Sequence, residues 1–167
     1  MSTRLFCRPP QQSDLDFVFQ LYTDARTGAL SPVAALTTPD DAQVMLNEWI
    51  RHWQAHDFGP WMISLYGAPE QLIGCGGISL RDFAGECLPN LWYRFDPAVW
   101  GQGYASEFVQ AALKHFQDLH RYSEVHALVL PKNAASIRVL EKSGLQAYGE
   151  LSGKEGADAS LCYRLQF

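Results

Sequence analysis

The chain has 167 residues, of which 47% are hydrophobic and 19% are charged, and its formal net charge is −5 at pH 7. This size and composition predict one globular domain spanning residues 1–167, and the acidic balance argues against a nucleic-acid partner. No apolar run reaches the ~18 residues that a membrane span needs. We therefore expect no membrane association, a cytoplasmic location, and a monomer or a homodimer.

The cysteines do not form a metal-binding or redox pattern. They stand far apart in the chain, without a Cys-x-x-Cys pair and without a histidine at metal-ligand spacing: Cys7, Cys75, Cys87 and Cys162. We expect reduced, partly buried thiols and no metal site.

The first half of the chain has signals for strands at its ends and helices between them. The pattern predicts a strand at 4–8, helices that begin at Ser13 and Thr38 with a polar connection at 23–37, and a hairpin of strands 61–66 and 72–80 around a turn at 67–70. Thr38 is followed by proline and two acids, which is typical of a helix start. Gly74, Gly76 and Gly77 predict a bulge or close backbone packing in the second hairpin strand.

The second half alternates strands and helices. The pattern predicts a loop at 82–89, a strand at 91–95, an amphipathic helix through Leu119, a strand at 125–130, a helix between Asn133 and Gly144, and a closing hairpin of 146–151 and 161–165 around 153–156. The order of elements predicts an α/β (α+β) fold with a mixed, mostly antiparallel sheet of about seven strands and helices on both faces.

A two-glycine loop, Trp100-Gly101-Gln102-Gly103-Tyr104-Ala105-Ser106, opens the helix after strand 91–95. Glycines let several backbone amides point to one place, and the positive end of the helix lies there, so a phosphate or pyrophosphate should bind. There is no Gly-Lys-Ser/Thr of a P-loop, and Ser106 replaces the third glycine of a dinucleotide fingerprint. An ordinary glycine turn before a helix is the alternative interpretation.

A second stretch, Asn133-Ala-Ala-Ser136 through Lys142-Ser-Gly144-Leu145, follows strand 125–130. Together the two stretches resemble the GNAT superfamily of acyl-CoA-dependent N-acetyltransferases, with its Gln/Arg-x-x-Gly-x-Gly/Ala loop and its Asn-x-x-Ser/Ala helix. The motif Trp-Gly-x-Gly-Tyr-Ala-x-Glu is closest to the branch that contains the ribosomal-protein-alanine N-acetyltransferases. The resemblance implies acetyl-CoA as cosubstrate and a primary amine, either a small molecule or a protein N-terminus, as acceptor.

The resemblance also implies where the cosubstrate lies. The strand before the loop would splay from the strand after the helix, which leaves a V-shaped gap between the two strands. The pantetheine arm would lie in this gap, and the pyrophosphate would bind to the loop amides. The implied cofactor-binding residues are Phe95, Trp100, Gly101, Gln102, Gly103, Tyr104, Ala105, Ser106 and Asn133. Arg138 and Lys142 are candidates for the 3′-phosphate, with solvated surface charges as the alternative.

The catalytic residues are less well marked than the cofactor loop. Many family members carry a tyrosine as general acid four residues after the position of Ser136, but this chain has Leu140 there. Ser136 is therefore the candidate acid, with water as its rival. Glu86 is the candidate general base because it precedes the splayed strand, and Asp82 and Asp158 are alternatives.

Two further expectations concern His126 and the acceptor. We expect His126 to be a structural histidine with satisfied nitrogens. Six acids lie in the two-helix region: Asp14, Asp16, Asp24, Asp40, Asp41 and Glu48. They predict an electronegative entrance to the acceptor site that favours cationic amines, although interaction with helix dipoles also explains some of these acids. A non-catalytic acyl-CoA sensor or interaction domain stays open as the alternative function, because a phosphate loop fits it equally well.

Overall fold

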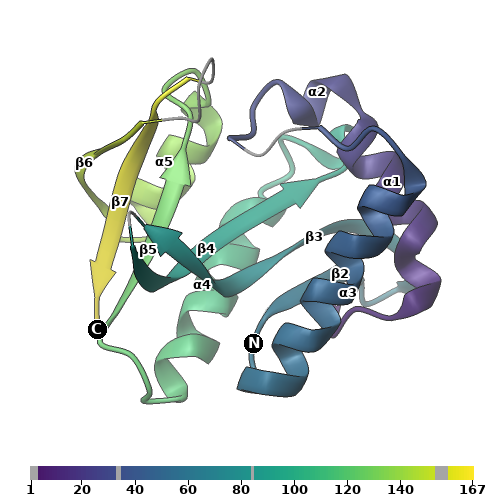
Figure 1. Cartoon of the computed structure of the whole chain (residues 1–167), viewed down its shortest axis with the longest axis horizontal. Coiled ribbons are helices and arrows are strands. Elements are labelled where there is room, and N and C mark those ends of the chain that lie inside the picture. The colour runs from purple at the N-terminus through teal and green to yellow at the C-terminus, as the bar shows by residue number, and fades with distance from the viewer. Residues whose placement is uncertain (1–3, 33–34, 84, 153–157) are drawn as a thin grey trace.

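The structure is a computed structural model that describes residues 4–32, 35–83, 85–152 and 158–167, and it is built on a seven-stranded sheet (Figure 1). The strands lie in the order β1-β2-β3-β4-β5-β7-β6. Their bounds are β1 (Leu5–Arg8), β2 (Pro60–Leu65), β3 (Ala68–Phe83), β4 (Glu86–Phe95), β5 (Glu124–Val129), β6 (Gln146–Leu151) and β7 (Ser160–Gln166). All neighbours pair antiparallel except β4 and β5, which are parallel. The predicted mixed, mostly antiparallel sheet is confirmed.

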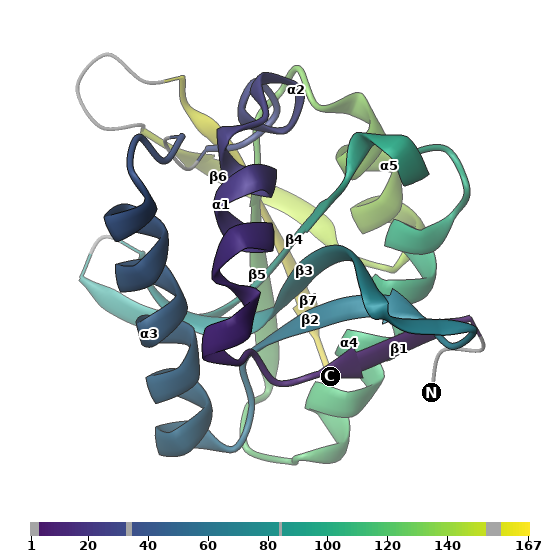
Figure 2. The same ribbon diagram turned by 90° about the vertical axis from the view of Figure 1, so that its right-hand side faces the viewer.

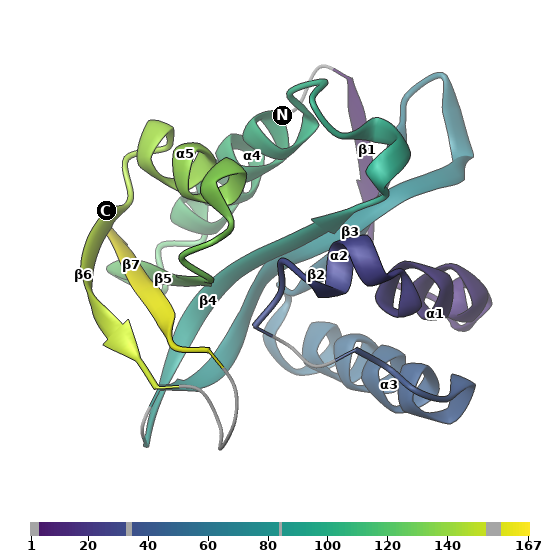
Figure 3. The same cartoon turned by 90° about the horizontal axis from the view of Figure 1, so that it is seen from above.

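Helices cover both faces of this sheet (Figure 3). On one face lie α1 (Leu15–Thr23), α2 (Ala25–Gly28) and α3 (Pro39–His56), and on the other lie α4 (Tyr104–Asp118) and α5 (Ala134–Lys142); short 3-10 turns, η1 (Gln12–Asp14) and η2 (Pro97–Val99), precede α1 and α4. Each face has its own hydrophobic cluster. None of the helices in the described ranges is both long and apolar enough to cross a membrane.

The residues of β4 divide between these two clusters. Leu91 and Phe95 pack with Phe108 of α4, whereas Trp92 packs against Trp49 of α3 with ring centroids 5.2 Å apart. Since side chains alternate along a strand, Tyr93 faces α4 and α5, and Arg94 faces α1 to α3. Adjacent residues of one strand therefore serve opposite sides of the sheet.

The pairing of β4 with β5 stops soon after it begins. The register joins Asn90 to His126 and Leu91 to Ala127, and it includes no later residue of either strand. β4 continues to Phe95 paired with β3 alone, while β5 pairs with β7. In Figure 1 the two strands diverge to form a V, with α5 beside β5 and α2 above the end of β4.

Local signals in the sequence predicted the start of α3 and the end of α5 correctly, but the helix start predicted at Ser13 is wrong, because Ser13 lies in η1 and α1 begins at Leu15. At the start of α3, the Thr38 hydroxyl accepts from the amide of Asp41 at 3.2 Å, and the Asp41 carboxylate accepts from the amide of Thr38 at 2.9 Å. Such a capping box satisfies two amides that the helix leaves free. Gly144 follows α5 with a φ of 90°, as expected of a glycine after a helix C-terminus.

The loop predicted at 82–89 is wrong, because β3 and β4 pair without a break as far as Phe83 and Glu86. Phe83 is 9% exposed and its ring lies 5.4 Å from that of His126, so burial of this side chain favours the longer strands. Asp82 stabilises the tight turn by accepting from the amide of Gly85 at 2.6 Å. Figure 2 shows the hairpin reaching past α3.

Two other connections were incompletely predicted or lie outside the structure. The polar connection at 23–37 contains α2, whose first turn is capped by Asp24, since its carboxylate accepts from the amide of Arg26 at 2.8 Å. The turn predicted at 153–156 lies outside the described residues.

The glycines of β3 pack closely against β4, as predicted. A Cβ added at Gly76 would lie 2.7 Å from the carbonyl oxygen of Trp92, and one at Gly74 would lie 2.7 Å from that of Arg94. Backbone atoms cannot move aside as a flexible side chain can. Small residues in β3 therefore set the path of β4 into the V.

We expect Gly76→Ala to lower the free energy of unfolding by about 1–3 kcal/mol, because the added methyl overpacks β3 against β4. Gly149→Ala is the matched control, since Gly149 is an exposed strand glycine with nothing within 4 Å of an added Cβ. Its effect should stay within about 0.5 kcal/mol. Urea unfolding of both variants measures the difference, and equal midpoints would contradict the close packing.

Candidate functional site

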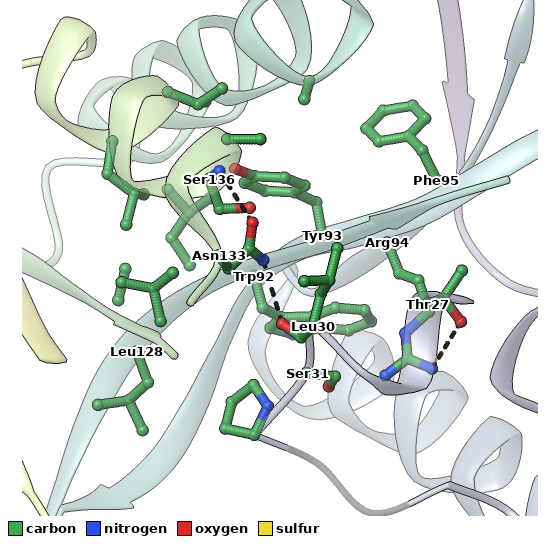
Figure 4. Close-up of a pocket in the computed structure, with 18 of the residues that line it drawn as sticks. Thr27, Leu30, Ser31, Trp92, Tyr93, Arg94, Phe95, Leu128, Asn133 and Ser136 are labelled. Atoms are coloured by element: carbon green, nitrogen blue, oxygen red, sulfur yellow. Dashed lines mark hydrogen bonds between the residues drawn. The ribbon is translucent and has the colours of Figure 1, made fainter. Parts of the chain in front are cut away.

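A cleft of about 710 Å³ opens in the V between β4 and β5. It receives residues from both strands, from the loop before α4, from α5 and from the segment after α2 (Figure 4). Its volume is typical of a site for a small molecule or a cofactor arm. Of the predicted cofactor-binding residues, those that line it are Phe95, Trp100, Gly101, Gly103, Tyr104, Ala105, Ser106 and Asn133. Gln102 is not among the described lining residues.

The loop before α4 presents backbone amides to this cleft. Gly101 and Gly103 have φ values of 76° and 80°, a region that favours glycine, and α4 starts directly after Gly103. The first amides of a helix have no acceptor within it, so those of residues 104–106 remain available to a ligand. The Trp100 indole Nε1 donates to the carbonyl of Phe95 at 2.9 Å and ties the loop to the end of β4.

An ion pair that the sequence did not predict supports this loop. Glu107 lies in the first turn of α4, where its charge would repel a phosphate. Arg4 of the N-terminal segment donates from Nε to Glu107 Oε2 at 2.6 Å and from its own amide to Oε1 at 2.8 Å. Its Nη1 also donates to the carbonyl of Gln102 at 3.1 Å. Arg4 therefore neutralises the acid and holds the loop, across a separation of 103 residues that no local pattern reveals.

Asn133 caps α5 and also joins it to the opposite side of the cleft. Its Oδ1 accepts from the amide of Ser136 at 3.1 Å, which is the cap that the sequence predicts. Its Nδ2 donates to the carbonyl of Leu30, just after α2, at 3.1 Å (Figure 4). Ser136, Arg138 and Lys142 of α5 line the cleft as well.

Tyr93 is a cleft residue that the sequence analysis missed. Its hydroxyl is buried and has no hydrogen-bond partner among the described residues. Burial raises the pKa of Tyr93 to about 12, against a smaller opposing effect of the nearby Ser136 hydroxyl. Figure 4 shows the Tyr93 ring beside Ser136. Its position two residues before Phe95, on the same face of the strand, could have identified it as a cleft residue.

Leu140, at the position of the family's usual acid, is 2% exposed.

The candidate bases lie away from the cleft lining. Glu86 is exposed at the first residue of β4, at the end opposite Phe95, and Asp158 pairs with Lys132 at 3.1 Å on the surface. The ring nitrogens of His126 contact the Tyr148 hydroxyl at 2.9 Å and a Glu124 oxygen at 3.1 Å, which fits a structural histidine. The described lining residues include no aspartate, glutamate or histidine.

The charged residues that line the described cleft are all basic: Arg81, Arg94, Arg138 and Lys142. The expected electronegative entrance is wrong for this lining, which includes no acid of the two-helix region, and three of those acids have local partners. Asp14 is 3% exposed and accepts from both terminal nitrogens of Arg8, at 2.8 and 2.6 Å. Asp24 accepts from Arg26, and Asp41 caps α3.

The acetyltransferase (GNAT) domain model matches residues 4–146. The chain therefore belongs to the GNAT acetyltransferase family and is a GNAT N-acetyltransferase domain. It is 30% identical over 102 residues to the uncharacterized protein YkkB of Bacillus subtilis, a match that covers 59% of this chain and 59% of YkkB. It is 25% identical over 161 residues to the uncharacterized N-acetyltransferase p20 of Bacillus licheniformis, covering 95% and 88% of the two chains.

Solved structures with the same fold include a GnaT-family acetyltransferase from Bordetella pertussis, with a TM-score of 0.84 and 21% identity over 98% of this chain and 96% of that one. Another is RimL, a ribosomal L7/L12 α-N-protein acetyltransferase in complex with coenzyme A, with a TM-score of 0.80 and 17% identity over 99% and 96%. Both identities are below 25%, so these structures confirm the fold and leave the acceptor of this chain open.

We expect Gly103→Ala to weaken acetyl-CoA binding at least tenfold, because the substitution moves amides that make charge-assisted hydrogen bonds to phosphate. Gly85→Ala is the matched control. Its φ of 98° imposes a similar backbone strain of about 1–2 kcal/mol in the β3–β4 turn, outside the described cleft lining. Calorimetry on both folded variants measures affinity. Equal affinities would remove the glycine loop from the site.

Proposed function

We propose that the chain moves an acetyl group from acetyl-CoA to a primary amine by direct attack of the amine on the thioester carbonyl. The V between β4 and β5 carries this proposal. The β5-facing edge of residues 92–95 has no strand partner in the described part of the chain, so it can pair with the extended amide arm of pantetheine as with an added strand. The amides of residues 101–106 would hold the pyrophosphate, and Arg138 and Lys142 the 3′-phosphate.

In the proposed reaction the amine nitrogen forms a bond to the carbonyl carbon, and the carbonyl oxygen becomes an oxyanion. A backbone amide of the free β4 edge would donate to that oxyanion, which is the kind of preorganised donor that contributes most to acyl transfer. The carbon–sulfur bond then breaks, the nitrogen loses its proton to solvent, and sulfur gains one. Coenzyme A and an acetylated amine leave.

Tyr93 and Ser136 would stabilise the departing sulfur from the α5 side of the V. With its pKa raised to about 12, Tyr93 keeps its proton at neutral pH. Complete transfer of this proton to a thiolate, whose thiol has a pKa near 8.5, would be uphill by ~5 kcal/mol. We therefore assign both hydroxyls the role of hydrogen-bond donors to the developing thiolate, with the proton itself supplied through water.

Asn90 would accept a hydrogen bond from a bound ligand on the other face of β4. Its Oδ1 is buried without a partner among the described residues, and the side chain lines the cleft where β4 and β5 part. Such an oxygen is satisfied when it accepts an N–H from a ligand. Since no carboxylate or imidazole lines the described cleft, we propose that the amine loses its proton to water. Glu86, at the far end of β4, has no role in this step.

The direct test is release of coenzyme A in the presence of acetyl-CoA and a broad panel of primary amines and N-terminal peptides. We expect turnover with at least one class of acceptor. A protein that binds acetyl-CoA and acetylates nothing on this panel would be an acyl-CoA sensor, and the proposed activity would be wrong.

We expect Ser136→Ala and Tyr93→Phe each to lower kcat roughly ten- to a hundredfold, while the affinity for acetyl-CoA changes less than twofold. Tyr93→Phe should change the free energy of unfolding by less than about 1 kcal/mol, because the hydroxyl that it removes meets no hydrogen-bond geometry with a described residue and lies near only a weakly interacting Ser136 hydroxyl. Tyr66→Phe, at a tyrosine that is 56% exposed, controls for the loss of a phenol elsewhere. Wild-type kcat in both single variants and in the double variant would show that water alone donates hydrogen bonds to the departing sulfur.

We expect kcat/KM for a simple alkyl amine to rise tenfold per pH unit up to the pKa of the amine, ~10, because only its neutral fraction attacks. Acceptors of lower pKa should reach their plateau at correspondingly lower pH. A plateau that begins between pH 5 and 8 and disappears in Glu86→Gln would identify Glu86 as a base and contradict the water route.

A further inference from the structure

Arg94 is a buried cation in the half of the cleft that faces α1 to α3. The residue is 7% exposed, and its guanidinium carbon lies 3.8 Å above the centre of the Tyr22 ring. Its Nη1 donates to the Thr27 hydroxyl at 3.3 Å, and no carboxylate of the described chain lies within 4 Å. Figure 4 shows Arg94 and Thr27 on the opposite side of β4 from Ser136 and the Tyr93 ring.

This arrangement leaves most of the hydrogen-bonding capacity of the guanidinium unused. A guanidinium carries five N–H donors, and only Nη1 has a partner in the described part of the chain. Tyr22 covers one flat side of the group, which leaves the in-plane edge free to bind two oxygens of a carboxylate. A buried cation without an anion loses its hydration without full compensation, so the protein keeps such a group where a ligand supplies the anion.

The other charged residues of the described lining are also basic, and the nearest of them on β3, Arg81, pairs with Leu88, six residues along β4 from Arg94. Arg81 lies on the same face of the sheet as Ser79, whose hydroxyl accepts from the Trp92 indole at 3.1 Å. Arg138 and Lys142 belong to α5, on the side proposed for the cosubstrate phosphates. Arg81 and Arg94 lie on the other side, so the phosphates of acetyl-CoA do not account for them.

Aromatic side chains form the walls beside Arg94. The rings of Tyr22 and Trp49 have centroids 6.0 Å apart, those of Trp49 and Trp92 lie 5.2 Å apart, and all three residues line the cleft together with Met45. Such walls suit an apolar group, since burial of apolar surface stabilises binding. The half of the cleft on this face of β4 therefore combines an anion-binding edge with an apolar compartment.

We propose that the acceptor is a small primary amine that also bears a carboxylate and an apolar side chain, as an apolar amino acid does, and that Arg94 binds the carboxylate. This inference rests on the proposed acetyltransferase function. Arg94 and Tyr93 are adjacent on β4, so an acceptor held by Arg94 has its amine next to the edge along which the thioester is proposed to lie. A protein N-terminus has an amide in place of this carboxylate and lacks the group that Arg94 selects.

The first experiment compares leucine and phenylalanine with their amides as acceptors, by coenzyme A release. The amine of an amino-acid amide has the lower pKa and thus the larger neutral fraction, so intrinsic reactivity favours the amides. We expect the wild-type protein to prefer the free acids in kcat/KM by tenfold or more. Equal use of acids and amides, or a preference for the amides, would overturn the inference and leave the acetyltransferase function intact.

The second experiment assigns the preference to Arg94. Arg94→Gln should raise KM for the free acids by roughly 10- to 150-fold, the range for hydrogen bonds to a charged group, and leave the amides nearly unaffected. The KM of Arg94→Lys for the free acids should lie between those of the wild type and Arg94→Gln. Lysine keeps the positive charge but lacks the planar guanidinium that binds two carboxylate oxygens at once. Unchanged acetyl-CoA affinity shows that each variant is folded. Arg26→Gln, at an exposed arginine outside the described lining, is the control. An unchanged acid preference in Arg94→Gln would contradict the assignment.

The third measurement separates this inference from the proposed function, because it needs no turnover. Calorimetry with the protein saturated by coenzyme A compares N-acetyl-leucine with N-acetyl-leucinamide. We expect the acid to bind at least tenfold more tightly, and this difference to disappear in Arg94→Gln. If no amine is acetylated while this difference remains, the function is wrong and the anion site stands. If the two compounds bind equally, the anion site is wrong.

Discussion

The early end of the β4–β5 pairing is the constraint on which the rest of the site depends. Both strands are held on their outer sides, β4 by β3 and β5 by β7, so neither closes the gap beyond Leu91 and Ala127. The free edge of β4 lines the open cleft, so its amides and carbonyls are available to a ligand. A ligand with an extended amide arm would pair with this edge as an added strand does.

Contacts on both sides of the V hold it open. The Trp100 indole fixes the end of β4 to the glycine loop, and Arg4 fixes that loop to the N-terminal segment. Across the gap, the Asn133 amide ties α5 to the segment after α2 through the carbonyl of Leu30. The contacts of Arg4 and Asn133 join residues that are 98 and 103 positions apart in the sequence. The cleft is thus a property of the whole sheet and its helices.

Alternation along β4 would separate the two roles proposed for Tyr93 and Arg94. Tyr93 points to the α5 side, where its uncharged hydroxyl suits a sulfur atom that is gaining charge, and Arg94 points to the α1 side, where its charge suits an anionic acceptor. One strand can therefore present a donor to the leaving group and an anchor to the acceptor without the two groups meeting. Asn90 lies where the strands part, on the same face of β4 as Arg94.

The sequence predicted what local chemistry determines and missed what distant contacts determine. The glycine loop, the Thr38 capping box and the Asn133 cap are each readable within a few residues. The loop predicted at 82–89 failed because the burial of Phe83 against β5 outweighs the polar composition around it. The electronegative entrance failed because none of the acids in the two-helix region lines the described cleft. The Arg4–Glu107 pair and the stacking of Arg94 on Tyr22 need the fold itself, and the proposed roles of the site residues remain predictions.

Residue-resolved amide hydrogen exchange, measured with and without acetyl-CoA, shows whether acetyl-CoA occupies the V between β4 and β5. We predict that the ligand protects amides in two segments, the free β4 edge at residues 92–95 and the loop at residues 101–106. The β1–β2 pairing, far from the V in the sheet order, should exchange at the same rate in both states. Protection elsewhere, with residues 92–95 and 101–106 unchanged, would contradict the account.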